Sequence, residues 1–285
     1  MNLWELLNAP AIIKVALFFG VWGLVWLPIA IATAKALNWH PPQPLKEEQK
    51  PFFLASLYLI VPWIVGYLCQ VENLSFSSYG WFWQISTGIS VVIGLSVAIL
   101  CLVVLLTIEW ILGWINWQPQ PPLKLTTSPK SSNNIFSAVC SLLSILLLGL
   151  WISGTEELVF RGFVHYHLQQ DYTVVIAATI TSLIFALTHL IWNIQETIPQ
   201  LPGLWLMGMV LTLACLYDQG LGLAIGLHAG LIWGITSVQT LGTLTYTRRV
   251  PQWVTGIADQ PLAGGMGITM LLMLAGLFWT VYNLG

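Results

Sequence analysis

The chain contains several uninterrupted apolar stretches of 18 or more residues, each long enough to cross a bilayer as a helix. Inside a membrane no water is present to satisfy backbone polar groups, so a spanning segment must be helical or belong to a closed barrel. A barrel would need segments of ~10 residues with alternating polarity, and none occurs. Only 7% of the residues are charged, against roughly 25% in soluble domains. The sequence therefore predicts an all-α polytopic membrane protein.

About eight transmembrane helices are expected. The first apolar run follows no basic segment and no clear cleavage site, so we expect a retained span rather than a signal peptide. The fourth span could continue as a helix through EELVFRGFVHYHLQQ and leave the lipid at an angle. The predicted spans cover roughly 11–36, 52–70, 84–114, 135–156, 174–192, 202–217, 221–240 and 264–284.

The positive charges predict an orientation. Only Lys14 and Arg161 lie away from odd-numbered loops, and the other basic residues lie in or beside them: Lys35, Lys46, Lys50, Lys124, Lys130, Arg248 and Arg249. The positive-inside rule then places odd-numbered loops in the cytoplasm and both termini outside. With 1.5 Å per residue, Glu156 would lie ~33 Å along the fourth span, near the outer interface.

The stretch GTEELVFRG (154–162) places three charged side chains directly after about twenty mostly apolar residues. Charges at membrane depth are costly and are by default candidates for function. On a helix, Glu157 and Arg161 are i and i+4 in the order that favours an ion pair, whereas Glu156 is rotated by about 100°. The spacing predicts that Arg161 holds Glu157 and leaves Glu156 free to face a cavity as a general base. The alternative is that these charges only mark the polar end of the span.

Two later spans each carry a histidine, His189 near the end of the fifth and His228 in the middle of the seventh. A single histidine in a membrane helix is more often a packing residue, but two of them with a carboxylate pair, on three spans, indicate a shared polar site. Small residues let helices approach closely, and His228 lies roughly opposite Gly226. The seventh span carries a glycine at every fourth position: Gly222, Gly226, Gly230 and Gly234.

Three motifs in this order, EELVFR (EExxxR), FALTH (FxxxH) and GLHAG with its membrane-embedded histidine, resemble the CPBP family. That family comprises CAAX prenyl-protein endopeptidases and bacteriocin-processing enzymes and is also called the Abi family. The resemblance implies a four-helix catalytic core. We accordingly divide the chain into an N-terminal transmembrane region (1–134), the CPBP-like core (135–240) and a loop with a C-terminal helix (241–285).

The resemblance implies an intramembrane endopeptidase that acts on membrane proteins or on lipidated peptides, in the plasma membrane or an internal membrane of a bacterium. By this resemblance Glu156 matches the carboxylate that activates water. Glu157 and Arg161 match its supporting pair, and His189 and His228 match the motif histidines. A glutamic mechanism would need no cofactor. In the alternative, Glu156, His189 and His228 would bind zinc, since two His and one Glu are a catalytic zinc set, although the helical HExxH signature is absent.

One position departs from the family pattern, because the last motif usually continues HxxxN or HxxxD and here the fourth residue after His228 is Ile232. Loss of an oxyanion donor costs about 10²–10³ in kcat. Either another group, such as Asn193, replaces the missing donor, or the protein is weakly active or non-catalytic. A non-catalytic member would act as a scaffold or assembly factor with a membrane complex as its partner.

Other polar residues are expected to have structural roles. We expect Glu109 and Lys14 to pack near span ends, and His165 and His167 to lie at the membrane interface on different helix faces. Embedded Glu and His residues can also form proton relays in transporters, but no inverted repeat with broken helices is evident. No basic patch indicates a nucleic-acid partner, and the four cysteines lack CxxC spacing, which argues against disulfides and a structural zinc site.

Overall fold

The computed structural model describes residues 8–43, 45–46, 48–117, 134–191, 193–242 and 244–284. In these residues, eight helices are long and apolar enough to cross a membrane, which confirms the predicted fold class and indicates a multi-pass integral membrane protein. The first four membrane segments are α2 (Ala11–Ala36), α3 with α4 (Lys50–Leu59 and Val61–Glu72), α5 (Ile85–Ile111), and α6 with η2 and α7 (Asn134–Glu157, Leu158–Val164 and His165–Asp171).

The last four segments also lie close to their predicted positions. They are α8 with η3 (Val174–Thr188 and His189–Ile191), α9 with η4 and α10 (Ile194–Thr197, Ile198–Gln200 and Leu201–Asp218), α11 (Gly222–Leu241), and α13 (Gly265–Leu284). Short elements fill the connections: η1 (Phe76–Tyr79), β1 (Ile115–Trp117), β2 (Leu244–Tyr246), α12 (Gln252–Thr255) and η5 (Pro261–Ala263).

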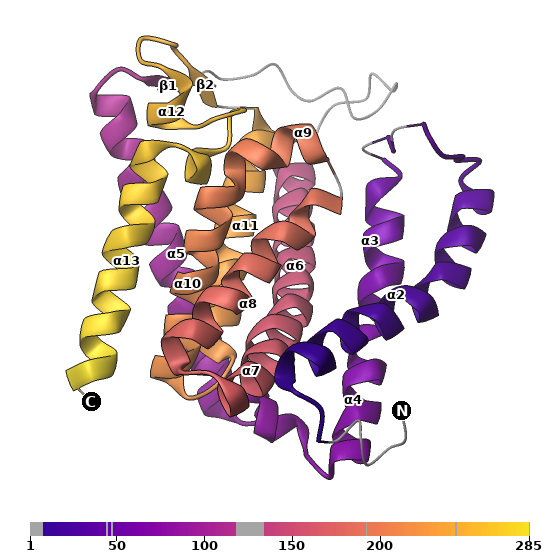
Figure 1. Ribbon diagram of the computed structural model, residues 1–285. Coiled ribbons are helices and arrows are strands. Elements are labelled where there is room, and N and C mark those ends of the chain that lie inside the picture. Colours follow the sequence, from indigo (N-terminus) through magenta and orange to yellow (C-terminus); the bar gives the residue numbers. More distant parts are fainter. Residues whose placement is uncertain are drawn as a thin grey trace.

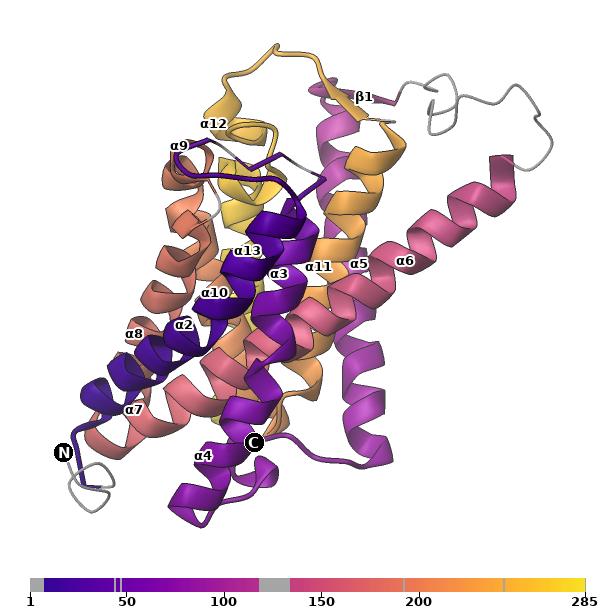
Figure 2. The same ribbon diagram turned by 90° about the vertical axis from the view of Figure 1, so that its right-hand side faces the viewer.

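The fourth span is longer than the predicted 135–156, because the apolar helix continues without a break from Phe136 to Asp171. A π-helical stretch, η2, joins its two α-helical parts, and such stretches inside α-helices often occur at functional sites. The charged residues do not end the helix, because their side chains are paired and buried inside the protein. In Figure 2, α6 runs obliquely across the bundle toward α7.

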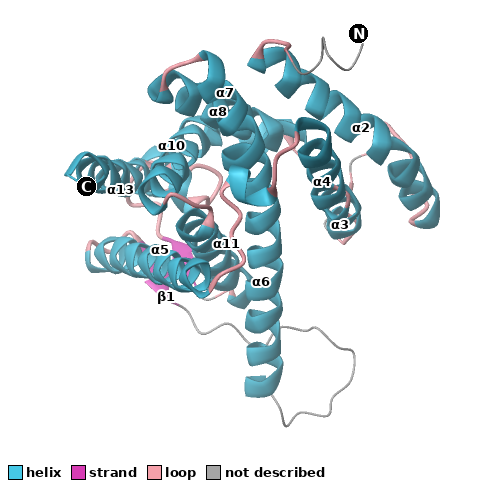
Figure 3. Ribbon diagram, turned by 90° about the horizontal axis from the view of Figure 1, so that it is seen from below, coloured by secondary structure: helices cyan, strands magenta, loops and turns pink. Residues whose placement is uncertain are grey.

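The predicted glycine stripe lets α11 pack directly on α5. A Cβ atom on Gly226 would overlap the Val91 carbonyl and would lie 2.8 Å from the Leu95 backbone nitrogen. A Cβ on Gly230 would lie 2.6 Å from that of Ala98. Figure 3 shows the two helices side by side. This close packing fixes the α11 backbone, and therefore the position of His228, as expected from its place opposite Gly226.

The connections alternate between two ends of the molecule, as eight successive crossings require. One end carries the short antiparallel pair β1–β2 together with α9 and α12, and we call it the β-sheet end; α7 lies at the opposite end (Figure 1). The β-sheet end is where the odd-numbered connections lie. The N-terminal hairpin of α2, α3 and α4 stands on one side of α6, away from α5 and α11 (Figure 3).

Candidate active site

The predicted Glu157–Arg161 pair is present, and it extends to a third residue. Arg161 donates a hydrogen bond from Nη1 to Oε1 of Glu157 over 2.9 Å, and both side chains are fully shielded from solvent. The same oxygen lies 2.7 Å from Nδ1 of His228. The second Arg161 amino group donates to the Gly208 carbonyl over 3.0 Å. One buried carboxylate therefore joins α6, η2 and α11, and Arg161 ties them to α10.

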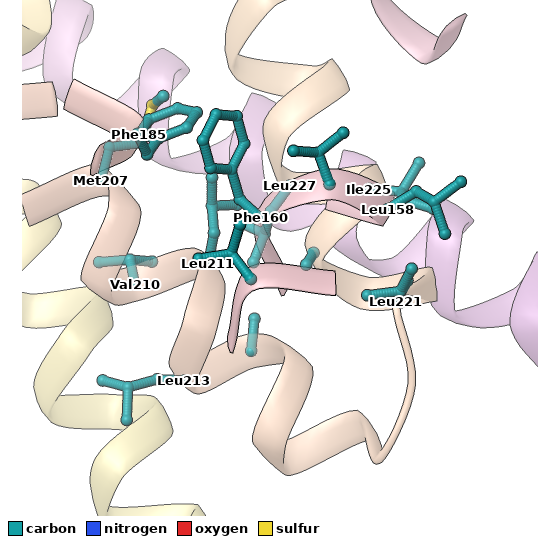
Figure 4. Close-up of a cluster of buried hydrophobic side chains, with 14 of the residues drawn as sticks. Leu158, Phe160, Phe185, Met207, Val210, Leu211, Leu213, Leu221, Ile225 and Leu227 are labelled. Atoms are coloured by element: carbon teal, nitrogen blue, oxygen red, sulfur yellow. The ribbon is translucent and has the colours of Figure 1, made fainter. Parts of the chain in front are cut away.

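An aromatic residue of the FALTH motif covers this network. The Phe185 ring lies 4.7 Å from the Arg161 guanidinium carbon and meets the rings of His189 and His228 edge-on, at 4.7 and 5.8 Å between centroids. Phe160 and Phe185 approach one another in the apolar cluster of Figure 4. A cation held over an aromatic face in a dry environment is stabilised by the ring quadrupole, so Phe185 orders both histidines and the arginine.

Glu156 points away from the arginine, as its rotation on the helix predicts. Its Oε1 accepts a hydrogen bond from the Tyr58 hydroxyl, which comes from α3. Its Oε2 is buried, has no hydrogen-bond partner in the described part of the chain, and lies 3.6 Å from Nε2 of His228. The two carboxylates therefore differ in their partners: Oε1 of Glu157 accepts from a guanidinium, whereas Oε1 of Glu156 accepts from a neutral phenol, and among the described residues the second oxygen of each has no hydrogen-bond partner.

His189 is held through a single ring nitrogen. Its Nδ1 lies 2.8 Å from the carbonyl oxygen of Phe185, and because a carbonyl can only accept, Nδ1 carries the proton. In the neutral imidazole, Nε2 then has a free lone pair. His189 is only partly buried, so this nitrogen is available to water or a substrate.

Two cavities meet at Glu156 and His189. The first, the polar cavity, has a volume of about 250 Å³ and is also lined by His228 and three glutamines, Gln200, Gln239 and Gln260. The second, the aromatic cavity, has a volume of about 270 Å³ and is lined mainly by apolar side chains of α2, α3 and η2: Phe19, Trp22, Trp26, Tyr58 and Phe160. A substrate that combines a polar chain with an apolar group could occupy both.

The polar cavity explains how a site placed deep in the bundle is reached. Its three glutamines lie in or beside the odd-numbered connections, which are at the β-sheet end (Figure 1). This is also the end that carries most of the Lys and Arg residues. Glu156 itself lies near the other end of α6, as its predicted depth along the fourth span implies, and the polar cavity extends from it toward the β-sheet end.

Ile232 lines the polar cavity at the position where the family motif has Asn or Asp. The side chain at this position is therefore apolar and cannot donate a hydrogen bond. Asn193 does not replace the missing donor: its Oδ1 accepts the backbone N–H of Glu196 as the N-cap of α9, and its side chain lines neither cavity. Beyond Ile232 on α11, Thr236 and Gln239 also line this cavity, further along the helix from His228.

The zinc alternative has a suitable donor set but not the arrangement. In the described residues, no group of three or more His, Cys, Asp or Glu side chains is gathered to hold a metal ion. Both histidines use Nδ1 on an oxygen atom, Oε1 of Glu157 for His228 and the Phe185 carbonyl for His189, and this leaves each Nε2 as the nitrogen that a metal would bind.

Residues 138–234 match a protein-family model described as "Type II CAAX prenyl endopeptidase Rce1-like". This segment is a domain of that family. The Rce1-like domain contains all five predicted site residues and lies within the predicted core of 135–240. Membership of a protease family implies peptide substrates, and the eight helices imply a bilayer around them. No curated protein and no solved structure gives a match to this chain.

Sequence reasoning missed one contributor to the site. Tyr58 lies outside the Rce1-like domain, in an apolar span with no charge beside it, so only the three-dimensional fold links it to Glu156. Phe185 lies four residues before His189 in the FALTH motif, and this spacing predicts its place on the same helix face, where its ring meets that of His189.

Two polar groups predicted to be peripheral are buried in the protein. His165 and His167, expected at the membrane interface, are both buried, and His167 lies 3.3 Å from Glu72 and 3.4 Å from the Tyr79 hydroxyl. Lys14 approaches the same Glu72 at 3.5 Å. Because Tyr79 is buried beside that carboxylate, its pKa is raised and it remains a hydrogen-bond donor. This second cluster fastens α2 and α4 to α7 and does not touch the site.

Proposed function

We propose that the protein is an intramembrane endopeptidase that hydrolyses peptide bonds of membrane-associated or lipidated substrates, with Glu156 as the general base. The observation that carries this proposal is that Glu156 lines the polar cavity and that its Oε2 has no hydrogen-bond partner among the described residues and lies 3.6 Å from a histidine nitrogen. A general base must lie within hydrogen-bond reach of the proton that it removes, directly or through one water.

In the proposed reaction, a water molecule donates one hydrogen bond to Oε2 of Glu156 while Nε2 of His189 accepts the other. The scissile carbonyl lies in the polar cavity and is attacked by the water oxygen, and Glu156 takes the proton. That proton then passes to the leaving amine, directly or by way of Nε2 of His228. The water oxygen forms a bond to the carbonyl carbon, and the C–N bond to the leaving amine breaks. This hydrolysis needs no oxidant or reductant.

Glu157 and Arg161 support this proton transfer. Nδ1 of His228 already donates to Glu157. When Nε2 accepts a proton, the imidazole becomes positively charged, and the neighbouring Glu157 carboxylate stabilises that charge. Arg161 in turn balances Glu157. The supporting pair thus stabilises a transient charge on His228 without occupying the reactive oxygen of Glu156.

The two cavities support an amphiphilic substrate. A peptide backbone would find hydrogen-bonding partners along the glutamines of the polar cavity, and a lipid chain or large apolar side chain would enter the aromatic cavity. We propose a bacterial plasma or internal membrane as the location, with the peptide reaching the site from the cytoplasmic side.

The decisive experiment compares the membrane proteome of cells that carry the wild-type protein with cells that carry Glu156→Gln. The substitution removes the base but keeps size and shape, so uncleaved precursors should accumulate while expression stays unchanged. Equal precursor levels in the two strains would refute the protease. The apolar Ile232 in the polar cavity favours one second candidate, a scaffold or assembly factor; it predicts that Glu156→Gln complements a deletion fully and that the protein co-purifies with a larger complex.

A further inference from the structure

Tyr58 is a buried phenol that reaches Glu156 from outside the Rce1-like domain. It belongs to α3, its side chain is only 6% exposed, and its hydroxyl donates to Oε1 of Glu156. Ninety-eight positions separate the two residues along the chain. The N-terminal hairpin therefore contributes a group to a site whose glutamates, arginine and histidines all come from residues 138–234.

We infer that Tyr58 is a positioning residue for the reaction: it fixes the Glu156 carboxylate through Oε1 so that Oε2 alone faces the attacking water. This inference rests on the proposed function. An ionised carboxylate offers two equivalent acceptors, and a freely rotating group would present either of them to water. The hydrogen bond from Tyr58 removes that equivalence, because it occupies Oε1, whereas Oε2 has no hydrogen-bond partner in the part of the chain that the structure describes.

The chain just before the tyrosine is held by two hydrogen bonds. The indole of Trp22 donates to the carbonyl oxygen of Leu57 over 3.0 Å, and that of Trp26 donates to the Ser56 hydroxyl over 3.0 Å. Both bonds come from α2 and fasten the two residues directly before Tyr58. These hydrogen bonds restrict the movement of α3 at Tyr58, so its hydroxyl stays in a fixed position, as a positioning role requires.

The ring of Tyr58 is packed between two tryptophans. Its centroid lies 6.4 Å from that of Trp22 and 6.5 Å from that of Trp151, which is on α6 five residues before Glu156. The ring therefore contacts the same helix as the carboxylate that its hydroxyl orients. Removal of the hydroxyl alone should leave this aromatic packing in place.

A neutral phenol is better suited than a cation to orient the Glu156 carboxylate. Arg161 neutralises Glu157, and a carboxylate in a direct ion pair is a weaker base for water. Tyr58 stabilises and orients Glu156 through one neutral donor and brings no positive charge to the cavity. The two neighbouring glutamates thus have different partners, a guanidinium for the supporting residue and a phenol for the base.

The test compares Tyr58→Phe with a matched control, Tyr67→Phe. Tyr67 lies on α4 of the same hairpin and is 67% exposed. With a fluorogenic peptide that ends in a farnesylated CAAX tail, kcat of Tyr58→Phe should fall ten- to hundredfold, the range expected for loss of a hydrogen bond to a charged group. KM should stay within about twofold, and Tyr67→Phe should match the wild type. Wild-type kcat in Tyr58→Phe, or a rise in KM alone, would overturn the inference.

An infrared measurement separates this inference from the proposed function. The carboxylate stretching band that disappears in Glu156→Gln should shift in Tyr58→Phe and stay in place in Tyr67→Phe, whether or not the peptide is cleaved. If the wild-type protein cleaves the peptide no faster than Glu156→Gln, the proposed function fails for this substrate. The infrared band then still shows whether Tyr58 holds the Glu156 carboxylate. An unshifted band in folded Tyr58→Phe would show that the hydroxyl does not hold Glu156.

Discussion

The imidazole of His228 is bonded to Glu157 over 2.7 Å, not to Glu156, whose nearer oxygen lies 3.6 Å from its other ring nitrogen. The histidine thus stands between two carboxylates that differ in their remaining partners. Glu157 also accepts from Arg161, and Glu156 accepts from Tyr58. This asymmetry underlies the different roles proposed for the two glutamates, and it predicts that their substitutions fail in different ways.

Glu157→Gln should destabilise the protein, whereas Glu156→Gln should not. Removal of one partner of a buried ion pair leaves an uncompensated charge, which costs about 3–5 kcal/mol, and Arg161 is fully buried. Thermal unfolding in detergent should show a clearly lower midpoint for Glu157→Gln, and both variants should lose activity. Equal midpoints for the two variants would mean that Glu157 does not hold the arginine in place.

The substitution Gly226→Ala tests the contact between α11 and α5. A methyl group there would overlap the backbone of Val91 and Leu95, and overpacking typically costs about 1–3 kcal/mol or more. Gly20→Ala is the matched control, since nothing lies within 4 Å of the added atom. We expect a lower unfolding midpoint for Gly226→Ala only. If both variants unfold at the wild-type temperature, the helices are further apart than the structure indicates.

The sequence alone predicted the eight membrane spans and the pairing within one helix. Both depend on local spacing: apolar runs of bilayer length and an i,i+4 relation between Glu157 and Arg161. The suggested continuation of the fourth span through EELVFRGFVHYHLQQ is confirmed. The burial of its charges was not predictable, because the helices that cover them are distant in the sequence. The contact of Tyr58 with Glu156 is a product of tertiary packing and has no sequence signal.

The orientation of the cavity can be tested by cysteine labelling in a background without Cys69, Cys101, Cys140 and Cys215. Asn116→Cys lies at the β-sheet end in β1, and Ser77→Cys lies at the opposite end in η1; both positions are exposed. In a bacterial host, a membrane-impermeant maleimide should label position 77 in intact cells and position 116 only after permeabilisation. The reverse pattern would place the entrance of the polar cavity outside the cell.

Ile232→Asn should raise the activity of the enzyme. The side chain at 232 lines the polar cavity one helical turn after His228, and an amide there could donate a hydrogen bond to the developing oxyanion. Such a donor is worth about 10²–10³ in kcat when it is preorganised, so a gain of about tenfold is a reasonable expectation for a group placed without supporting contacts.

The control for that gain is Ile235→Asn, which adds the same amide to the same cavity one turn further along α11. We expect kcat to rise in Ile232→Asn and to stay level or fall in Ile235→Asn, measured with the same prenylated peptide. An equal response at both positions would assign any change to cavity polarity in general. An unchanged or lower kcat in Ile232→Asn would mean that another group already serves the oxyanion, and Gln239 and Thr236, which line the same wall, would be the next residues to substitute.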